Sequence, residues 1–466
     1  MINKNKRKLS NQVGSATVLV VITIFSFAII LMGTYLTITT LLKSQIKSDI
    51  RIQELYGADV NRIDDLYEEI TTVPMETITT QFNKAYGVIE IVWLDTDNNV
   101  ISDALSPASY LGGLTPVKWT GTAGSYIETT TTTSDTDWYS YTAQTGATTS
   151  GGTSKWANAV TSDGNAYFVW IPRYAYKITY FDNETNKEAY RADNTSTTGI
   201  VGYSTIYGML DITGEKQKLV EGTKPTNVTG TVKTSAYSDY IPHPAFEFDG
   251  AKPGIWVGKY QSSGSTTTVT IKPDEIVLTT VGVKSNIFTA NQGVKTTYGL
   301  TSDSHMMKNT EWGAVAYLTE SKYGRNGTKV STNNNSGFYT GRSAGSSNTS
   351  SFSYVYNTEN GILASTTGNI FGIYDMSGPI YQYVAGYIDN EYAGTTLINA
   401  DTKYKDVYSI GSSDTSANNY SANKGIKGDA VYETSTDGTT CTSWHKNHSY
   451  FPNISGTVFL RGRLLQ

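Results

Sequence analysis

The sequence predicts an α+β protein that begins with a long transmembrane helix and passes through a small β-hairpin region into a mixed α+β head. Three observations predict this class: a long uncharged run near the N-terminus, an alternating segment at 84–105, and later strand-like stretches around one helix-like segment. The predicted parts are a basic leader (1–14), the helix (15–74), the small β region (75–111), a Thr/Ser/Gly-rich linker (112–164) and the head (165–466).

The composition indicates where such a protein works. Of its 466 residues, 38% are hydrophobic and 17% are charged, and the formal net charge is -5. Basic residues cluster only at the N-terminus, which argues against a nucleic-acid partner. Tyr, Thr, Ser, Asn and Gly are used heavily, as is typical of an extracellular or cell-surface protein. The single cysteine, Cys441, cannot form an internal disulfide.

From Leu9 to Leu42 no side chain carries a charge, and the apolar run in this stretch is long enough to cross a bilayer whose hydrocarbon core is about 30 Å thick. Basic residues at positions 4–8 precede this run, so the positive-inside rule predicts a cytoplasmic N-terminus and a head outside the cell. Apolar residues recur at three- and four-residue spacing as far as Ile70, and no proline interrupts them before Pro74. We therefore expect the protein in the cell envelope, with the membrane as one partner.

A basic leader, then Gly14, then an apolar helix start with a long amphipathic extension resembles the precursor of a type IV pilin or pseudopilin, of the minor-pilin type. In that family a prepilin peptidase cuts after the glycine, so the resemblance implies that Ser15 becomes the mature N-terminus. It also implies the peptidase and other pilin subunits as partners. The chain departs from the family at Leu19, where the family usually has a glutamate. A single-pass signal anchor is the alternative interpretation.

The segment 84–105 predicts a β-hairpin because apolar residues alternate on both sides of a polar turn. Asp95, Asp97 and Asn99 in this turn are spaced like the start of a calcium loop. However, Val100 stands where such a loop needs a glycine, so we expect a plain turn. The linker that follows is interpreted as an exposed segment or a set of loose strands, with three tryptophans as occasional anchors.

Four landmarks define the head. They are a glycine-containing strand (252–263), a helix that starts at Asn309 as its cap and ends near Gly324, an aromatic, Gly-rich turn (369–386), and the closing segment (456–466). In an earlier strand, Pro172 predicts an edge position or a break, because proline has no N–H to donate.

The order of these landmarks resembles the formylglycine-generating enzyme family, also called the sulfatase-modifying-factor domain. The matching residues are Asn369, Gly372, Asp375, Met376 and Gly378 in the turn, Trp312 in the helix, and Arg461 with Gly462 near the end. The resemblance covers about residues 165–466, and it implies a C-type-lectin-like fold for the head.

Two departures from that family bear on the chemistry. Pro379 and Gln382 stand where the family has the Asn and Glu that bind calcium, so we expect the calcium to be lost and no cofactor to be bound. The family's oxidative reaction uses a pair of cysteines that bind copper, which the single Cys441 cannot supply. The head is therefore expected not to be an enzyme.

Three residues near the C-terminus form a candidate metal site. Cys441, His445 and His448 lie close enough in sequence to ligate zinc, with an ordinary exposed loop as the alternative. His243 and His305 are expected to be structural.

A polar loop at 331–356 and the tyrosines that follow the turn form a candidate binding face, because such residues make adaptable recognition surfaces. Its members are Tyr339, Tyr381, Tyr383 and Tyr387. A solvated insertion without a specific role is the alternative.

Together these observations lead us to expect a surface-exposed minor pilin or pilin-like protein whose non-catalytic head binds a glycan or a protein in adhesion. One alternative is a membrane-tethered enzyme of the formylglycine-generating type. Another is a purely structural protein that caps a filament or spaces an assembly at the envelope.

Overall fold

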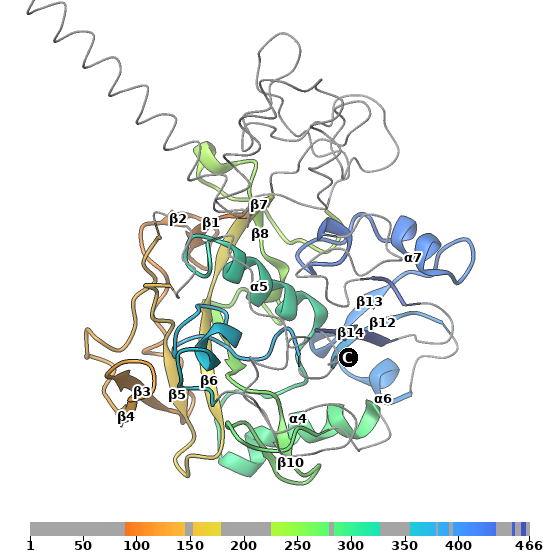
Figure 1. Ribbon diagram of the computed structural model, residues 1–466. Helices are drawn as coiled ribbons and strands as arrows, with labels where there is room; N and C mark the ends of the chain where they lie inside the picture. Colours follow the sequence, from red (N-terminus) through yellow and green to blue (C-terminus); the bar gives the residue numbers. More distant parts are fainter. Residues whose placement is uncertain are drawn as a thin grey trace, which may run out of the picture. The chain divides into compact units, whose positions relative to one another are not determined.

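The computed structural model describes residues 89–144, 152–178, 225–278, 284–326, 355–378, 381–390, 395–434, 450–452 and 458–462 (Figure 1). All of them belong to one unit, Glu54–Gln466. Within these residues the strands form four separate sheets, and nearly all neighbouring strands are antiparallel.

The largest sheet has five antiparallel strands in the order β4-β3-β5-β6-β9. They are β3 (Thr115–Thr120), β4 (Ile127–Thr130), β5 (Asn158–Val160), β6 (Tyr167–Pro172) and β9 (Gly254–Gly258). The inward-facing side chains of β3, Val117 and Trp119, are buried. The region 112–164 is therefore built into this sheet through β3, β4 and β5 rather than serving as a linker.

The second sheet has four strands in the order β2-β1-β7-β8. They are β1 (Ile89–Leu94), β2 (Val100–Ile101), β7 (Tyr174–Ile178) and β8 (Ile241–Pro242). β1 pairs with β2 across a tight turn, in which one Asp95 carboxylate oxygen accepts hydrogen bonds from the Asp97 and Asn99 N–H groups (2.9 and 2.8 Å). β1 also pairs with β7 along its length, so the hairpin is part of the head.

β6 and β7 are one run of chain with only Arg173 between them, yet they belong to different sheets (Figure 1). Pro172 ends β6, as its missing N–H predicts. The Arg173 side chain is buried at this junction, where it donates to the Phe246 carbonyl (3.0 Å) and pairs with Glu247. The two sheets are therefore joined by continuous backbone and by a buried cation.

Two smaller sheets complete the strand structure. One has three strands in the order β13-β12-β14, in which β12 (Gln382–Ile388) pairs in parallel with β13 (Asp406–Tyr408) and antiparallel with β14 (Val458–Arg461). The other pairs β10 (Ser263–Gly264) with β11 (Val269–Thr270).

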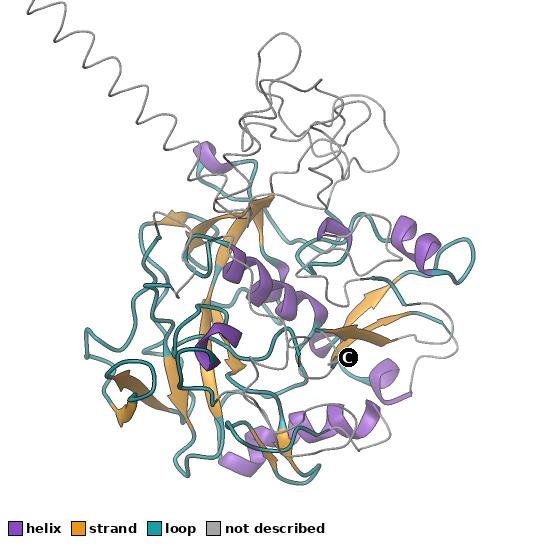
Figure 2. Cartoon of the chain, in the orientation of Figure 1, coloured by secondary structure: helices purple, strands orange, loops and turns teal. Residues whose placement is uncertain are grey.

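Helix α5 (Asn309–Glu320) lies at the centre of the described part, surrounded by strands and loops (Figure 2). All of its residues except the last are buried. It packs against β1, β12 and a short 3₁₀ helix, Pro244–Phe246. The sequence predicted an amphipathic helix here, but burial is on every face, and Asn309 is the first helical residue rather than the cap. Glu311 supplies the cap instead, because its carboxylate accepts from the Lys308 N–H (2.8 Å).

The remaining α-helices have more exposed residues than α5. The α-helices are α4 (Lys284–Tyr298), α6 (Thr395–Asn399) and α7 (Ser416–Ala422). The other 3₁₀ helices are Ser235–Tyr237, Gly361–Ala364, Thr402–Tyr404 and Tyr432–Thr434.

The predicted fold class needs correction in its helical part and in its order of elements. The prediction of a long transmembrane helix followed by a separate hairpin and a head is wrong for what the structure describes, where the longest α-helix has 15 residues. No helix among the described residues is both long and apolar enough to cross a bilayer. Helices this short are stabilised by packing against the rest of the protein rather than by their own length. Residues 1–74 lie outside the described part.

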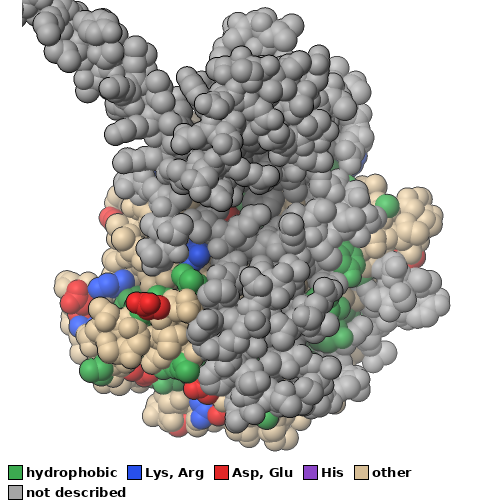
Figure 3. All heavy atoms as spheres, viewed as in Figure 1, with side chains coloured by type: hydrophobic (Ala, Val, Ile, Leu, Met, Phe, Trp, Pro, Cys, Tyr) green, Lys and Arg blue, Asp and Glu red, His purple; other side chains and the backbone are tan. Residues whose placement is uncertain are grey.

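Charged side chains on the coloured part of the face in Figure 3 lie among polar and apolar ones, with both signs present. This distribution agrees with the mild formal net charge of -5. A strip of one sign, which a nucleic-acid partner would need, is not visible among the described residues on that face.

We predict that Gly313→Ala destabilises the protein, because a Cβ at this position in α5 would lie 2.0 Å from the Gly428 carbonyl oxygen. Overpacking of this kind costs about 1–3 kcal/mol, even though alanine favours a helix. Gly293→Ala in α4 is the control, since its Cβ would meet nothing within 4 Å. That change is expected to stabilise by up to about 1 kcal/mol. Urea unfolding of both variants measures the difference, and equal effects would contradict the prediction.

Candidate functional site

The predicted turn motif begins at Asn369, whose side chain holds the turn in place. Its amide nitrogen donates to the Gly152 and Ser154 carbonyls (both 2.8 Å), and its amide oxygen accepts from the Phe371 N–H (3.0 Å). Gly372 is needed because a Cβ there would lie 2.6 Å from the Thr367 hydroxyl. These two matched residues therefore serve the backbone geometry.

Lys259, which follows β9, is fully buried and forms hydrogen bonds to the same turn. Its ammonium donates to the carbonyls of Ile370 (2.5 Å) and Gly372 (3.0 Å) and lies 4.5 Å from the centroid of the Trp119 ring. Burial lowers the pKa of Lys259 well below its usual value, and Glu128 acts in the opposite direction. The cation–π contact and the two hydrogen bonds compensate for the lost hydration.

The end of the turn is shaped by two residues with positive φ, Asp375 (62°) and Gly378 (132°). The Asp375 carbonyl accepts from the Gln382 side-chain amide (2.7 Å), which comes from the start of β12. Met376 is buried between the core and the cavity described below.

Three backbone carbonyl oxygens of this turn accept hydrogen bonds from side chains. Those of Ile370 and Gly372 accept from an ammonium, and that of Asp375 accepts from an amide N–H. Gln382 thus presents a donor to the turn, and the loss of calcium stays a prediction.

Arg461, the other half of the predicted motif, lies beside Gln382 in the ladder of β12 and β14, but its side chain enters the core. The guanidinium is 3.9 Å from the centroid of the Trp312 ring and donates to Asn309 Oδ1 (3.0 Å) and the carbonyls of Asp429 and Ala430 (both 2.9 Å). Gly462 follows with a φ of 80°. Backbone pairing of β12 and β14 thus brings the end of the turn motif close to Arg461. The Arg461 side chain, however, contacts α5 and the loop at 429–430 rather than the turn.

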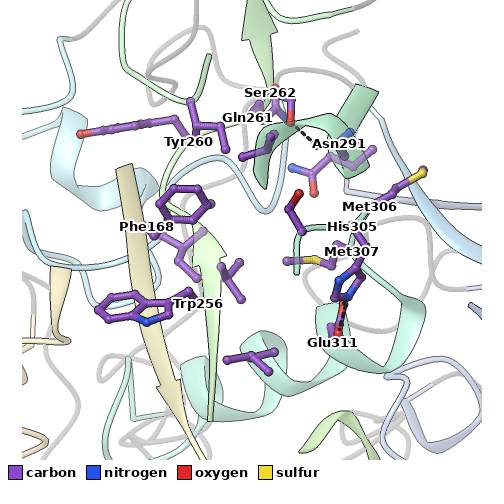
Figure 4. Close-up of a pocket in the computed structure, with 18 of the residues that line it drawn as sticks. Phe168, Trp256, Tyr260, Gln261, Ser262, Asn291, His305, Met306, Met307 and Glu311 are labelled. Carbon is purple, nitrogen blue, oxygen red and sulfur yellow. Dashed lines mark hydrogen bonds and ion pairs between the residues drawn. The ribbon is translucent and has the colours of Figure 1, made fainter. Parts of the chain in front are cut away.

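A cavity of about 260 Å³ lies beside the turn. Its walls come from β9, α4, the segment before α5, the turn and the start of β12, and most of them are aliphatic, aromatic or thioether side chains. Figure 4 shows Phe168 and Trp256 on one side of it and His305, Met307 and Glu311 on the opposite side, with Ser262 and Gln261 above.

Two polar side chains in this wall, Ser262 in the segment after β9 and Asn291 in α4, are hydrogen-bonded to each other. Ser262 donates its hydroxyl to Asn291 Oδ1 (3.1 Å), and Asn291 Nδ2 donates to the Ile287 carbonyl (2.8 Å). These hydrogen bonds orient both side chains.

His305 and Glu311 form the charged end of the cavity. The imidazole Nε2 is 2.8 Å from Glu311 Oε1 and 3.0 Å from Oε2, and the ring packs against Phe248 and Tyr404. Burial alone raises the pKa of Glu311, but His305, Lys308 and the Lys308 N–H outweigh it, so the pKa lies below its usual value. The carboxylate is therefore ionised near neutral pH and holds the imidazole in one orientation.

The predicted binding-face tyrosines are divided by the structure. Tyr381 and Tyr383 line the cavity, and Tyr383 is 37% exposed. Tyr387 is buried against Phe288 and Met306 and does not line it. Tyr339, the junction of Gly14 and Ser15, and the group Cys441, His445 and His448 lie outside the described residues. Within the described part of the chain, no group of three metal-ligating side chains comes together.

Sequence reasoning missed three residues of this site. Lys259 lies in the predicted strand 252–263, but nothing in the sequence pattern assigned it a role. His305 was expected to be structural. Glu311 stands where the Glu of a capping box is expected, but Lys308 occupies the position where that pattern has Ser or Thr, so the sequence shows only half of the signal. His243, by contrast, is buried as expected, and Nδ1 accepts from the Ala245 N–H (3.2 Å).

A search of protein-family models and of curated proteins finds no match to this chain. The resemblances to pilins and to the formylglycine-generating family therefore stay predictions.

We predict that Lys259→Met destabilises the protein by about 2–4 kcal/mol, because two buried carbonyl oxygens lose their donor. Lys272→Met is the matched control, since Lys272 makes a surface ion pair with Glu275 and a long hydrogen bond to Asn165 Oδ1 (3.3 Å). That pair is worth about 0–1 kcal/mol. Denaturant unfolding of both variants checks the prediction, and a loss for Lys259→Met no larger than the control would refute it.

Asp429 gives a pH-dependent contribution to stability. Burial and the neighbouring Glu433 raise its pKa, while the Val431 N–H, Arg461 and Tyr408 lower it, and the net result is a pKa of about 6. Because the folded state binds this proton more tightly, the contribution is complete below the unfolded pKa of about 4 and is lost as the pH rises through 6. Relative to Asp429→Asn, the wild type should lose about 3 kcal/mol of unfolding free energy between pH 4 and 7.

Urea unfolding at several pH values measures this difference. The exposed Asp97→Asn serves as the control and should show a much flatter difference from the wild type. If the unfolding free energy of the wild type instead increased relative to that of Asp429→Asn as the pH rises, the predicted direction would be wrong.

Proposed function

We propose that the described part of the chain is a non-catalytic binding module that is displayed at the cell surface, with the cavity beside the turn as its ligand site. The observation that carries this proposal is the cavity itself, with apolar walls and a few oriented polar groups. Small-ligand and side-chain pockets in proteins have this composition. Tyr381 and Tyr383 line it, and Met306 and Met307 add thioether side chains that adapt to a bound group.

The arrangement of polar groups favours binding over catalysis. The hydroxyl of Ser304, the neighbour of His305, donates to the Gln292 carbonyl (2.9 Å) and accepts from the Lys295 N–H (2.8 Å). The Ser262 hydroxyl is held by Asn291. A serine nucleophile would need its hydroxyl hydrogen-bonded to the histidine, and neither of these two is.

Display outside the cell is supported by the sequence. The leader residues, the junction of Gly14 and Ser15, and the heavy use of Tyr, Thr, Ser and Asn fit an exported, pilin-like protein. In this proposal the head contacts a glycan or a protein in adhesion.

The test is binding of the full chain to panels of glycans and peptides, followed by Tyr383→Ala. Because Tyr383 is a partly exposed aromatic of the cavity wall, its loss is expected to weaken binding by about tenfold. Tyr110→Ala is the matched control, since Tyr110 is 45% exposed and does not line the cavity. It should change the affinity less than about twofold. Blank panels would contradict a binding role and favour a structural spacer.

A further inference from the structure

We infer that the cavity accepts an apolar, aromatic-sized group that carries one hydrogen-bond donor, of which a phenol hydroxyl is the simplest example, and that His305 Nδ1 receives this hydrogen. The inference rests on the proposed binding function and names the chemistry of the ligand.

The tautomer of His305 follows from its partner. Both Glu311 oxygens lie within hydrogen-bond distance of Nε2, and Oε2 also accepts from the Lys308 N–H. An ionised carboxylate can only accept, so Nε2 carries a hydrogen, and in the neutral imidazole Nδ1 is then left as an acceptor. Glu311 is a positioning residue in this arrangement.

Nδ1 of His305 is buried and has no hydrogen-bond partner among the described residues. The whole side chain is only 12% exposed. Leaving a buried acceptor without a donor is costly, so such an atom in a native structure calls for a missing partner. Since His305 lines the cavity, a bound group that brings a donor can supply it.

The other walls favour an aromatic body for that group. Phe168 and Trp256 lie on the side opposite His305, and Met307 lies next to it (Figure 4). Aromatic rings pack well against aromatic faces and thioethers. The hydrogen of the Ser262 hydroxyl and one hydrogen of the Asn291 amide are already donated, to Asn291 Oδ1 and the Ile287 carbonyl.

The experiment compares two probes, 4-methylphenol and 4-methylanisole, for binding to the full chain by calorimetry. They have the same apolar body, but only the phenol can donate. We expect the phenol to bind about tenfold tighter, as one satisfied buried acceptor predicts. His305→Gln should remove the preference, and Glu311→Gln should reduce it without a loss of ligand contact, because the ring is no longer held.

Near-UV circular dichroism checks that both variants fold, and Tyr110→Ala should keep the preference. A tyrosine-containing peptide compared with its phenylalanine counterpart distinguishes a protein-borne group from a free small molecule, and a preference in either pair supports the inference. Equal affinities in both pairs overturn it. Failure of both pairs to bind, while a panel member binds, also overturns it and leaves the proposed function intact. Failure of both pairs together with blank panels overturns both.

Discussion

The buried guanidinium of Arg461 is the contact on which the arrangement of the head most depends. It lies on the face of Trp312 in α5 and donates to the loop carbonyls of Asp429 and Ala430, so one side chain joins the last strand, the central helix and a loop. A charge without water must have all of these partners. The helix can therefore be buried on every face only while this strand is in place.

Lys259 repeats the same principle at the turn. In both places a cation inside the protein organises carbonyl oxygens that would otherwise lack donors. Residues of the turn and the tyrosines Tyr381 and Tyr383 line the same cavity. Neither Lys259 nor Arg461 lines the cavity of the proposed ligand site, so both act on it only through the surrounding backbone.

Parts of the fold could be predicted from the sequence. The strand register and the contacts between distant side chains could not, because they depend on three-dimensional geometry. The helix near Trp312 and the break at Pro172 follow from residue types. Tyr383 and Tyr387 of β12 should share a face, but the register with β14 shifts between them, and this irregularity buries Tyr387. His305 meets Glu311 only because the segment between them is extended before the helix begins, which residue spacing does not show.

The single residue between β6 and β7 has a mechanical consequence. Because the two strands are one covalent segment shared by two sheets, a pulling force on either sheet passes directly into the other through Arg173. For a protein displayed where it meets shear, such a path would spread tension over both ladders of hydrogen bonds, so that neither sheet peels away alone.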